Sequence, residues 1–274
     1  MGARCGSSII AILALMSIAT NADADVRFGI AAEPYPPFAW KDATGEWVGW
    51  EVDLMNAVCR QLKEECTIVE VTWEGMIPSL NGHFIDVIWS TMSITDERLQ
   101  AIDFTDVYMN TPNVLIGLKN GDKELSPAHL QGKAIGVQAG SVHVRFAEKY
   151  YGATSTIKIY QTQDEVNQDL TAGRVDYVAP VALVADTFPK TDARMNCCEL
   201  KGTVPVDGKE SSVGGGVRKD DPELKVRLNA AIAAVLASGE CGDITRKYLS
   251  IDFVVNKVRS GKTWCDSVHL TGKN

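Results

Sequence analysis

Short strand-like runs alternate with helix-like runs along most of this chain, and this alternation constrains the fold more than any other feature. Val26–Ala31 (VRFGIA) is rich in residues that favour strands, and an apolar series with a helical period then spans 52–62. Two further strand-like runs, Ile68–Val71 and Ile85–Trp89, follow. Strands that alternate with helices predict an α/β sheet.

A second unit repeats this alternation. Strand-like runs cover Asn113–Gly117, Ala134–Val137 and Val175–Ala179, and helical patterns cover Val142–Tyr151 and Asp164–Ala172. The chain length suits one large domain or two small ones. No repeat or low-complexity linker separates the two units, so we expect the chain to cross between them more than once.

The clearest start and stop signals for a helix lie near the C-terminal end. Asp221 can cap the helix, Pro222 suits its first turn, and Gly239 can end it. Residues 250–274 form a tail of mixed character to which the pattern assigns no structure.

The first 24 residues predict a secretory signal peptide. Arg4 supplies a positive charge, residues 8–19 are apolar or small, and Ala22–Ala24 fits a cleavage site. This apolar run is shorter than the ~20 residues that span a bilayer. Cys5 precedes the run, so it is not the lipidated cysteine that can follow one. We therefore expect cleavage after Ala24 and export as a free protein.

Charge and cysteine content exclude several classes of partner. Acidic residues outnumber basic ones by 35 to 27 without a cluster of Lys and Arg, so we expect no nucleic acid. An even number of cysteines after residue 24 favours disulfides in an exported chain. They are Cys59, Cys66, Cys197, Cys198, Cys241 and Cys265. Their spacing lacks the C-x2-C pattern of zinc sites, so we expect no metal. We expect no other cofactor.

A polar cluster follows the strand-like run that ends at Trp89. It contains the hydroxyls of Ser90, Thr91 and Ser93 and the guanidinium of Arg98. Ligands of open α/β sheets bind at the carboxyl ends of strands, and Arg matches a carboxylate with two parallel donors. The alternative is a helix-capping loop with a solvated Arg, and composition alone favours it.

Residues 90–105 (STMSITDERLQAIDFT) resemble a motif of the polar amino-acid-binding proteins of ABC importers, which form family 3 of the solute-binding proteins. That motif is S-[SGA]-x-[ST]-I-T-x-x-R-x-x-x-I-x-F-[ST], and the family includes histidine-, lysine/arginine/ornithine-, glutamine- and opine-binding proteins. Further matches follow in the same order: GWEVDL at 49–54, GMIPSL at 75–80, GKAIGV at 132–137 with Gly140 and Ser141, DLTAGRVD at 169–176 and GVRK at 216–219. The resemblance covers roughly Arg27 to Phe253, and six motifs in order make it specific.

The resemblance implies the fold of the type II periplasmic binding proteins, in which two α/β lobes are joined by two crossing hinge strands. The ligand cleft lies between the lobes. On this basis lobe 1 comprises 25–109 and 212–253, lobe 2 comprises 110–211, and 254–274 is a C-terminal tail. Hinges are expected near Tyr108–Asn113 and Glu210–Gly214.

The resemblance also implies disulfides. The spacing of Cys59 and Cys66 matches a disulfide of the histidine-binding branch, which ties the end of the first helix to the following strand. For the remaining cysteines the family offers no precedent. A bond between Cys241 and Cys265 would pin the tail.

In lobe 1 the resemblance implies a clamp for a carboxylate. Arg98 aligns with the Arg that grips the ligand α-carboxylate. Thr91 and Ser93 align with residues that hydrogen-bond the ligand backbone, and Ser90 aligns with a backbone contact beside them. Tyr35 and Trp73 align with the pair that sandwiches the ligand side chain. For Trp73 the alternative is core packing, which is also what we expect of Trp89.

In lobe 2 the resemblance implies a loop that closes on the same carboxylate. Gly140, Ser141 and Val142 align with the residues whose amides make that contact. Gln138 aligns with a position that reads the ligand side chain in some members.

Two departures from the family pattern concern the ligand ammonium. Where relatives place an Asp that pairs with the ammonium, this chain has Val181, and Ala32 replaces an acid of the first loop, with Glu33 adjacent. A buried ammonium without a carboxylate partner is strongly disfavoured. The ligand therefore lacks a free α-ammonium, as an opine-like conjugate or keto acid does, or another acid supplies the countercharge. The acids that could do so are Glu33, Glu74 and Asp164. A third explanation is an alignment that slips by one residue at 179–182, but no acid follows there before Asp186.

The resemblance thus implies a monomeric periplasmic solute-binding protein that delivers a small carboxylate-bearing, amino-acid-derived ligand to an inner-membrane ABC permease. Two other classes share the fold, namely a cyclohexadienyl dehydratase-like enzyme and a ligand sensor. The enzyme needs a general acid in the cleft. Because Val181 removes a carboxylate there, we expect no enzyme.

Overall fold

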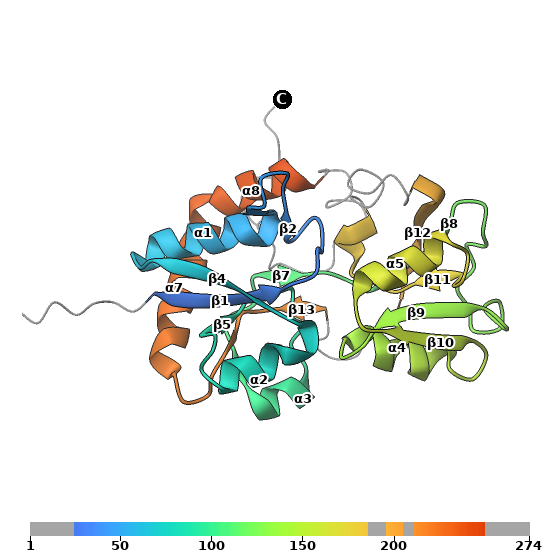
Figure 1. Ribbon diagram of the computed structural model, residues 1–274, viewed down its shortest axis with the longest axis horizontal. Helices are drawn as coiled ribbons and strands as arrows, with labels where there is room; N and C mark the ends of the chain where they lie inside the picture. Colours follow the sequence, from blue (N-terminus) through green and yellow to red (C-terminus); the bar gives the residue numbers. More distant parts are fainter. Residues whose placement is uncertain (1–24, 186–195, 205–210, 250–274) are drawn as a thin grey trace, which may run out of the picture.

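Two five-stranded sheets organise the described residues, 25–185, 196–204 and 211–249, of this computed structural model (Figure 1). The first sheet, in lobe 1, has the order β4 (Cys66–Val71), β1 (Val26–Ala31), β5 (Val87–Ile88), β14 (Gly216–Val217) and β6 (Asp103–Phe104). β1 pairs in parallel with β4 and β5, and β14 pairs antiparallel with β5 and β6. The expected α/β class is confirmed.

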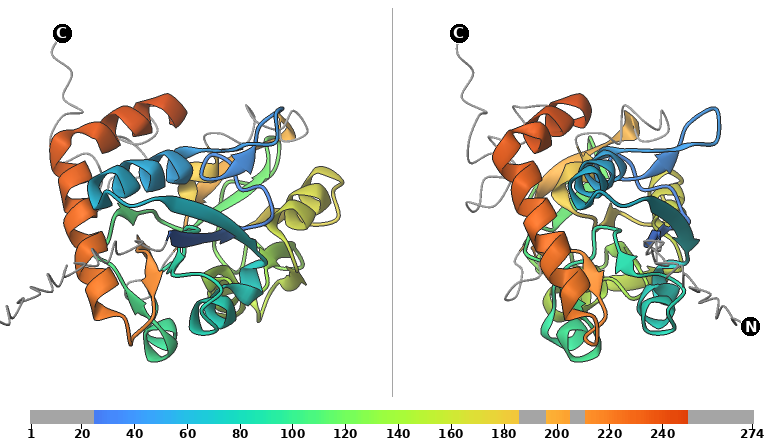
Figure 2. Two further views of the ribbon diagram at one scale, coloured as in Figure 1. Left: turned by 60° about the vertical axis from the view of Figure 1, so that its left-hand side comes forward. Right: turned by 90° about the vertical axis from the view of Figure 1, so that its left-hand side faces the viewer.

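Helices cover both sides of the first sheet. α1 (Trp50–Leu62), α7 (Pro222–Ser238) and α8 (Glu240–Tyr248) pack against one another, and α2 (Met76–Asn81) and α3 (Asp96–Ala101) lie on the other side (Figures 1 and 2). Lobe 1 also carries the small hairpin of β2 (Trp40–Lys41) and β3 (Trp47–Val48) and the single turn η1 (Trp73–Gly75).

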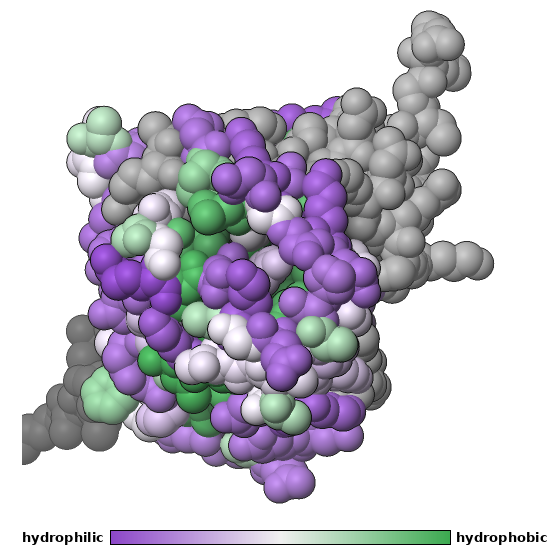
Figure 3. Space-filling view, turned by 90° about the vertical axis from the view of Figure 1, so that its right-hand side faces the viewer, coloured by the Kyte–Doolittle hydropathy of each residue, from purple (hydrophilic) through white to green (hydrophobic). Residues whose placement is uncertain are grey.

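The second sheet, in lobe 2, has the order β10 (Thr156–Tyr160), β9 (Ala134–Gln138), β11 (Tyr177–Val178), β8 (Val114–Leu118) and β12 (Cys198–Thr203). β9 pairs in parallel with β10 and β11, and β8 pairs antiparallel with β11 and β12. α4 (Val142–Tyr151) and α5 (Gln163–Thr171) pack against this sheet from opposite sides (Figure 1). The outer face of lobe 2 is largely hydrophilic, with narrow apolar bands (Figure 3).

A short antiparallel pair of strands crosses between the lobes. β7 (Met109–Asn110) carries the chain into lobe 2, and β13 (Ser212–Val213) carries it back (Figure 1). Both strands fall within the expected hinges, although Glu210 lies outside the described residues. The exact lobe boundaries stay a prediction.

The signals that delimit α7 are confirmed. The side chain of Asp221 accepts a hydrogen bond from the Leu224 amide at 3.1 Å, Pro222 is the first helical residue, and Gly239 has a φ of 84°. Only glycine adopts such a φ without strain, so the helix ends there.

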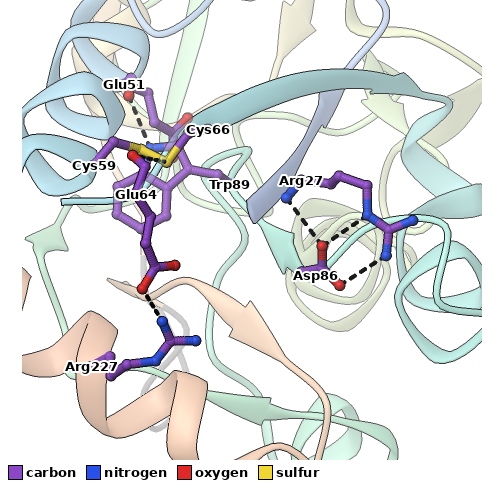
Figure 4. Close-up of a disulfide and its surroundings, with 8 residues drawn as sticks. All are labelled: Arg27, Glu51, Cys59, Glu64, Cys66, Asp86, Trp89 and Arg227. Atoms are coloured by element: carbon purple, nitrogen blue, oxygen red, sulfur yellow. Dashed lines mark hydrogen bonds and ion pairs between the residues drawn. A yellow bond between two sulfur atoms is a disulfide. The ribbon is translucent and has the colours of Figure 1, made fainter. Parts of the chain in front are cut away.

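The disulfide expected between Cys59 and Cys66 is present, and it joins α1 to β4 (Figure 4). The loop that it closes is tied further to α7, because Glu64 forms an ion pair with Arg227 (Figure 4). A second disulfide joins the neighbours Cys197 and Cys198.

Two other sequence predictions involve residues that lie outside the described ranges. Cys241 is disulfide-bonded, but its expected partner Cys265 lies outside them. The expected signal peptide, residues 1–24, and the tail, residues 254–274, also lie outside. Within the described ranges, every helix is too short or too polar to cross a membrane.

Candidate functional site

A cavity between the two lobes collects most of the residues expected at the ligand site. It encloses about 600 Å³, counting the part that is open to solvent. Its lobe 1 wall consists of Ala31, Glu33, Pro34, Tyr35, Trp73, Ser90, Thr91, Ser93 and Arg98, and its lobe 2 wall consists of Gln138, Ser141, Val142, His143, Gln163 and Val181.

Arg98 is placed by the start of α3. Thr95 caps this helix, because its hydroxyl accepts a hydrogen bond from the Arg98 amide at 3.1 Å. The guanidinium donates to the Ser93 carbonyl at 2.7 Å and, across the cleft, to the Gly140 carbonyl at 3.0 Å. It also lies 5.5 Å from the centre of the Trp73 ring. These contacts hold a permanent positive charge at the cavity wall.

A buried carboxylate behind the cavity fixes Thr91. Glu51, which is 1% exposed, accepts hydrogen bonds from the Thr91 amide at 2.7 Å and from the Thr91 hydroxyl at 2.8 Å. It also accepts one from the Tyr108 hydroxyl at 2.5 Å. Thr91 has a φ of 52°, a left-handed conformation that a β-branched residue rarely adopts. The two hydrogen bonds that Thr91 donates to Glu51 stabilise this geometry.

The carboxylate of Glu51 also links the cavity to the hinge. Tyr108 directly precedes β7 and stacks on Trp89 with the ring centres 4.5 Å apart. Burial raises the pKa of Glu51 and, together with the negative charge of Glu51, raises that of Tyr108. Trp89 is fully buried and donates to the Glu51 carbonyl at 2.9 Å (Figure 4). Its expected place in the core is confirmed.

Two aromatic rings from lobe 1 face the cavity. Tyr35 packs on Phe38 with the ring centres 5.5 Å apart. Burial raises the pKa of the Tyr35 phenol. Trp73 begins η1 and is half-buried. Both rings are therefore available to pack against a ligand side chain.

The lobe 2 wall comes from the start of α4, the end of β9 and the start of α5. The Ser141 hydroxyl donates to the Gln138 carbonyl at 2.6 Å, and the Gln163 amide donates to the side chain of Asn167 at 3.0 Å. Gly140 does not line the cavity, although its carbonyl receives Arg98. The expected contact of the Gly140 amide with a ligand carboxylate stays a prediction.

His143 was not expected at the site, yet it lines the cavity and is only 6% exposed. Its Nε2 lies 3.2 Å from the side-chain oxygen of Asn113. Burial and the positive charge of Arg98 lower the pKa of His143 to about 4. The imidazole is therefore neutral at neutral pH. The sequence feature that could have indicated His143 is its place on the buried face of the helical pattern at 142–151.

The acids considered as countercharges lie in different places. Glu33 lines the cavity, and its Oε2 is buried without a hydrogen-bond partner among the described residues. Asp164 and Glu74 are outside the cavity lining, and Asp164 accepts a hydrogen bond from Gln168. Ala32, expected at the position of the missing acid, is exposed and does not line the cavity. An acid of the first loop, Glu33, therefore does line the cavity.

The cavity residues fall into two groups with different chemistry. The anchor group, Ser90, Thr91, Ser93 and Arg98, supplies hydroxyls and a guanidinium. The side chains of Ser90, Thr91 and Arg98 are themselves held by hydrogen bonds to the protein. The selector group, Glu33, His143 and Val181, presents an unpartnered carboxylate oxygen, a neutral imidazole and an apolar side chain. Among the described residues, no group of three or more His, Cys, Asp or Glu side chains could hold a metal ion.

Comparison with known proteins gives a consistent result. A family model described as bacterial extracellular solute-binding proteins, family 3, matches residues 26–251. The L-arginine-binding protein of Pseudomonas aeruginosa is 41% identical, over 91% of this chain and 96% of that protein. The histidine-binding periplasmic protein of Salmonella typhimurium is 36% identical, over 89% and 96%. The structure of an ancestral arginine-binding protein bound to arginine has a TM-score of 0.73 at 30% identity, and the match covers 82% of this chain and 98% of that one.

Proposed function

The chain belongs to family 3 of the bacterial extracellular solute-binding proteins, and from this premise we propose that it carries a small amino-acid-derived carboxylate through the periplasm to an inner-membrane ABC permease. The relatives described above are binding proteins rather than enzymes. The proposed ligand is a carboxylate with a second, cationic group, and it is bound as the two lobes close.

The observation that carries the proposal is the position of Arg98 in the cavity beside the other members of the anchor group. A guanidinium recognises a carboxylate with two parallel hydrogen bonds, and hydrogen bonds to charged groups are the stronger ones. Because the cavity excludes much of the solvent, this interaction is screened less than one at the surface. The carboxylate is therefore proposed to bind at Arg98.

Glu33 supports the cationic part of the ligand. A buried carboxylate oxygen without a donor is unfavourable, so a group that donates to Oε2 of Glu33 would offset that cost. A guanidinium or ammonium of the ligand would supply both the donor and the opposite charge. The rings of Tyr35 and Trp73 suit the part of the ligand between its two charged ends.

Delivery to a permease requires two states of the lobes. β7 and β13 form a narrow double crossing, and the Arg98–Gly140 hydrogen bond spans the cleft. Ligand that contacts both walls would favour the closed state, in which it bridges them. The closed form is then the species that the permease recognises.

The proposal is tested by identifying the ligand that co-purifies with the protein, by mass spectrometry, and then measuring its affinity by calorimetry. Arg98→Ala is expected to weaken binding about 100-fold, since hydrogen bonds to charged groups contribute roughly 1.5–3 kcal/mol each. Arg174→Ala is the matched control, because Arg174 pairs with Asp169 on the surface of lobe 2, away from the cavity. Equal affinity in wild type and Arg98→Ala would remove the basis of the proposal.

A further inference from the structure

His143 is a buried titratable residue of the cavity to which the carboxylate clamp gives no role. It lies in the first turn of α4, and its hydrogen-bond partner Asn113 forms a β-bridge with Val181. His143 and Val181 therefore share one part of the lobe 2 wall. Both line the cavity, and Val181 stands where relatives are expected to pair the ligand ammonium.

The tautomer of His143 follows from its partner. As Asn113 is oriented in the structure, its side-chain oxygen lies against Nε2 of His143, and its side-chain nitrogen is buried without a partner among the described residues. With this orientation of the amide, Nε2 carries the proton, because an amide oxygen can only accept a hydrogen bond. In a neutral imidazole the other nitrogen, Nδ1, then has a lone pair and no hydrogen. Among the described residues, Nδ1 makes no hydrogen bond. Since Nδ1 is also absent from the fully buried unpartnered atoms, it is accessible, and the residue borders the cavity.

The surroundings of His143 disfavour a positive charge. Burial and the charge of Arg98 hold the imidazole in its neutral form, and Val181 offers no countercharge. A ligand ammonium at this point would be buried without a countercharge of its own, because Val181 is apolar and the ligand carboxylate is paired with Arg98. An uncharged O–H or N–H donor avoids the cost of burying a charge, and it could donate to Nδ1.

We propose that His143 is a specificity-determining residue whose Nδ1 accepts a hydrogen bond from an uncharged donor on the α-carbon of the ligand. The site then selects a 2-hydroxy acid or an N-acylated amino acid, with a cationic side chain, over the free α-amino acid. This inference rests on the proposed function, because the carboxylate at Arg98 and the cation at Glu33 set the orientation of the ligand.

Two nearly isosteric probes test the inference. L-Arginine and L-argininic acid, its 2-hydroxy analogue, share a carboxylate and a guanidinium and differ only in the α-substituent. Calorimetry is expected to give at least about tenfold tighter binding of L-argininic acid, because an ammonium without a countercharge is disfavoured. Equal or tighter binding of L-arginine would overturn the inference.

A pair of variants separates the role of Nδ1 from a structural role of the ring. His143→Gln can keep the contact with Asn113 but lacks an acceptor at the position of Nδ1, whereas His143→Asn can place an amide oxygen there. We expect His143→Gln to weaken L-argininic acid about tenfold and L-arginine less than threefold, and His143→Asn to restore most of the preference. A merely structural role would weaken both ligands equally in His143→Gln, and that result would overturn the inference.

A third probe keeps failure of the inference distinct from failure of the proposed function. Agmatine lacks the carboxylate of L-arginine, so the proposed function predicts that it binds poorly and that Arg98→Ala scarcely affects it. Agmatine binding as tight as that of L-argininic acid would refute the proposed function. If neither L-arginine nor L-argininic acid binds at millimolar concentration, the proposal that the ligand has a cationic side chain is refuted. The inference then fails with it.

Discussion

The anchor group and the selector group differ in how far the protein satisfies them before any ligand arrives. In the anchor group, both Thr91 donors are bonded to Glu51, the Ser90 hydroxyl accepts from the Ala31 amide at 3.0 Å, and Arg98 is bonded to two carbonyls. In the selector group, Glu33 Oε2 and His143 Nδ1 have no protein partner within the described ranges.

This difference separates general recognition from selection. A preorganised group binds what all ligands of a class share, because little ordering remains to be done when the ligand arrives. Unpartnered polar atoms instead reject any ligand that fails to satisfy them, since the buried atom then stays unpaired. The anchor group thus suits the shared carboxylate, and the selector group suits the part that differs between ligands.

The largest expected effect comes from removing the support of the anchor group. Glu51→Ala should lower the free energy of unfolding by about 3–5 kcal/mol, because it leaves buried donors of Thr91 and Tyr108 unpaired and opens a cavity. Urea denaturation measures this change. Glu51→Gln, which keeps one acceptor, should lose less. A loss below about 1 kcal/mol in Glu51→Ala would mean that Thr91 does not depend on this carboxylate.

Unfolding measured over a range of pH should show whether the buried imidazole of His143 is neutral. The folded-state pKa of His143 is lowered to about 4. At a pH below the ordinary histidine pKa, the unfolded chain therefore binds a proton at this residue that the folded chain does not bind. Stability should fall as the pH drops from about 6.5 towards 4, by about 2–3 kcal/mol between pH 7 and 4.5. The difference between wild type and His143→Gln isolates this effect from titrating carboxyls. Parallel curves for the two proteins would refute it.

Neutralising the carboxylate of the selector group should affect binding more than stability. Glu33→Gln is expected to weaken a cationic ligand such as L-argininic acid roughly 10- to 30-fold, because it removes a charge-assisted hydrogen bond. Thermal stability should stay equal or rise, since the variant no longer buries part of an unpaired carboxylate. Calorimetry and thermal unfolding measure the two effects. Unchanged affinity would exclude Glu33 as the countercharge.

The smallest expected effect comes from a substitution that shifts the preference of the selector group towards free amino acids. Val181→Asp should tighten L-arginine about tenfold relative to L-argininic acid, because the new carboxylate can pair with an ammonium. Val181→Asn, which has the same size without the charge, is the control. If both variants shift the ratio of affinities equally, polarity rather than charge governs selection at this position.

Much of the fold could be predicted because its signals are local. The caps of α7 at Asp221 and Gly239 act within one turn of the chain, and the period at 142–151 marks α4 to the residue. β12 was not predicted. Its sequence, CELKGT, has mixed polarity and a glycine, and it becomes a strand through antiparallel pairing with β8, about 80 residues away. Such pairing leaves little trace in a single segment.

The site could be predicted where a motif fixes the local backbone. The stretch at 90–98 fixes Arg98 through the cap at Thr95, and Arg98 does line the cavity. Glu33 and Ala32 show the limit, because a shift of one residue in an irregular loop decides which side chain enters the cavity. His143 and Gln163 line it only because the lobes come together. Their ligand-binding roles, like those of the anchor group, stay predictions.

The junction of the lobes contains an intrinsic fluorescent probe, Trp73. Trp73 of lobe 1 lies so close to Gly140 of lobe 2 that a Cβ on that glycine would be 3.4 Å from the indole nitrogen. Opening of the cleft would replace this neighbour with water, while Arg98, which belongs to the same lobe, would stay beside the ring. Trp50 and Trp89 are fully buried within lobe 1 and would keep their surroundings. Trp40 and Trp47 contact Tyr248 and Glu70 within the same lobe. Among the tryptophans of the described residues, the emission of Trp73 is therefore expected to report closure, without an attached dye.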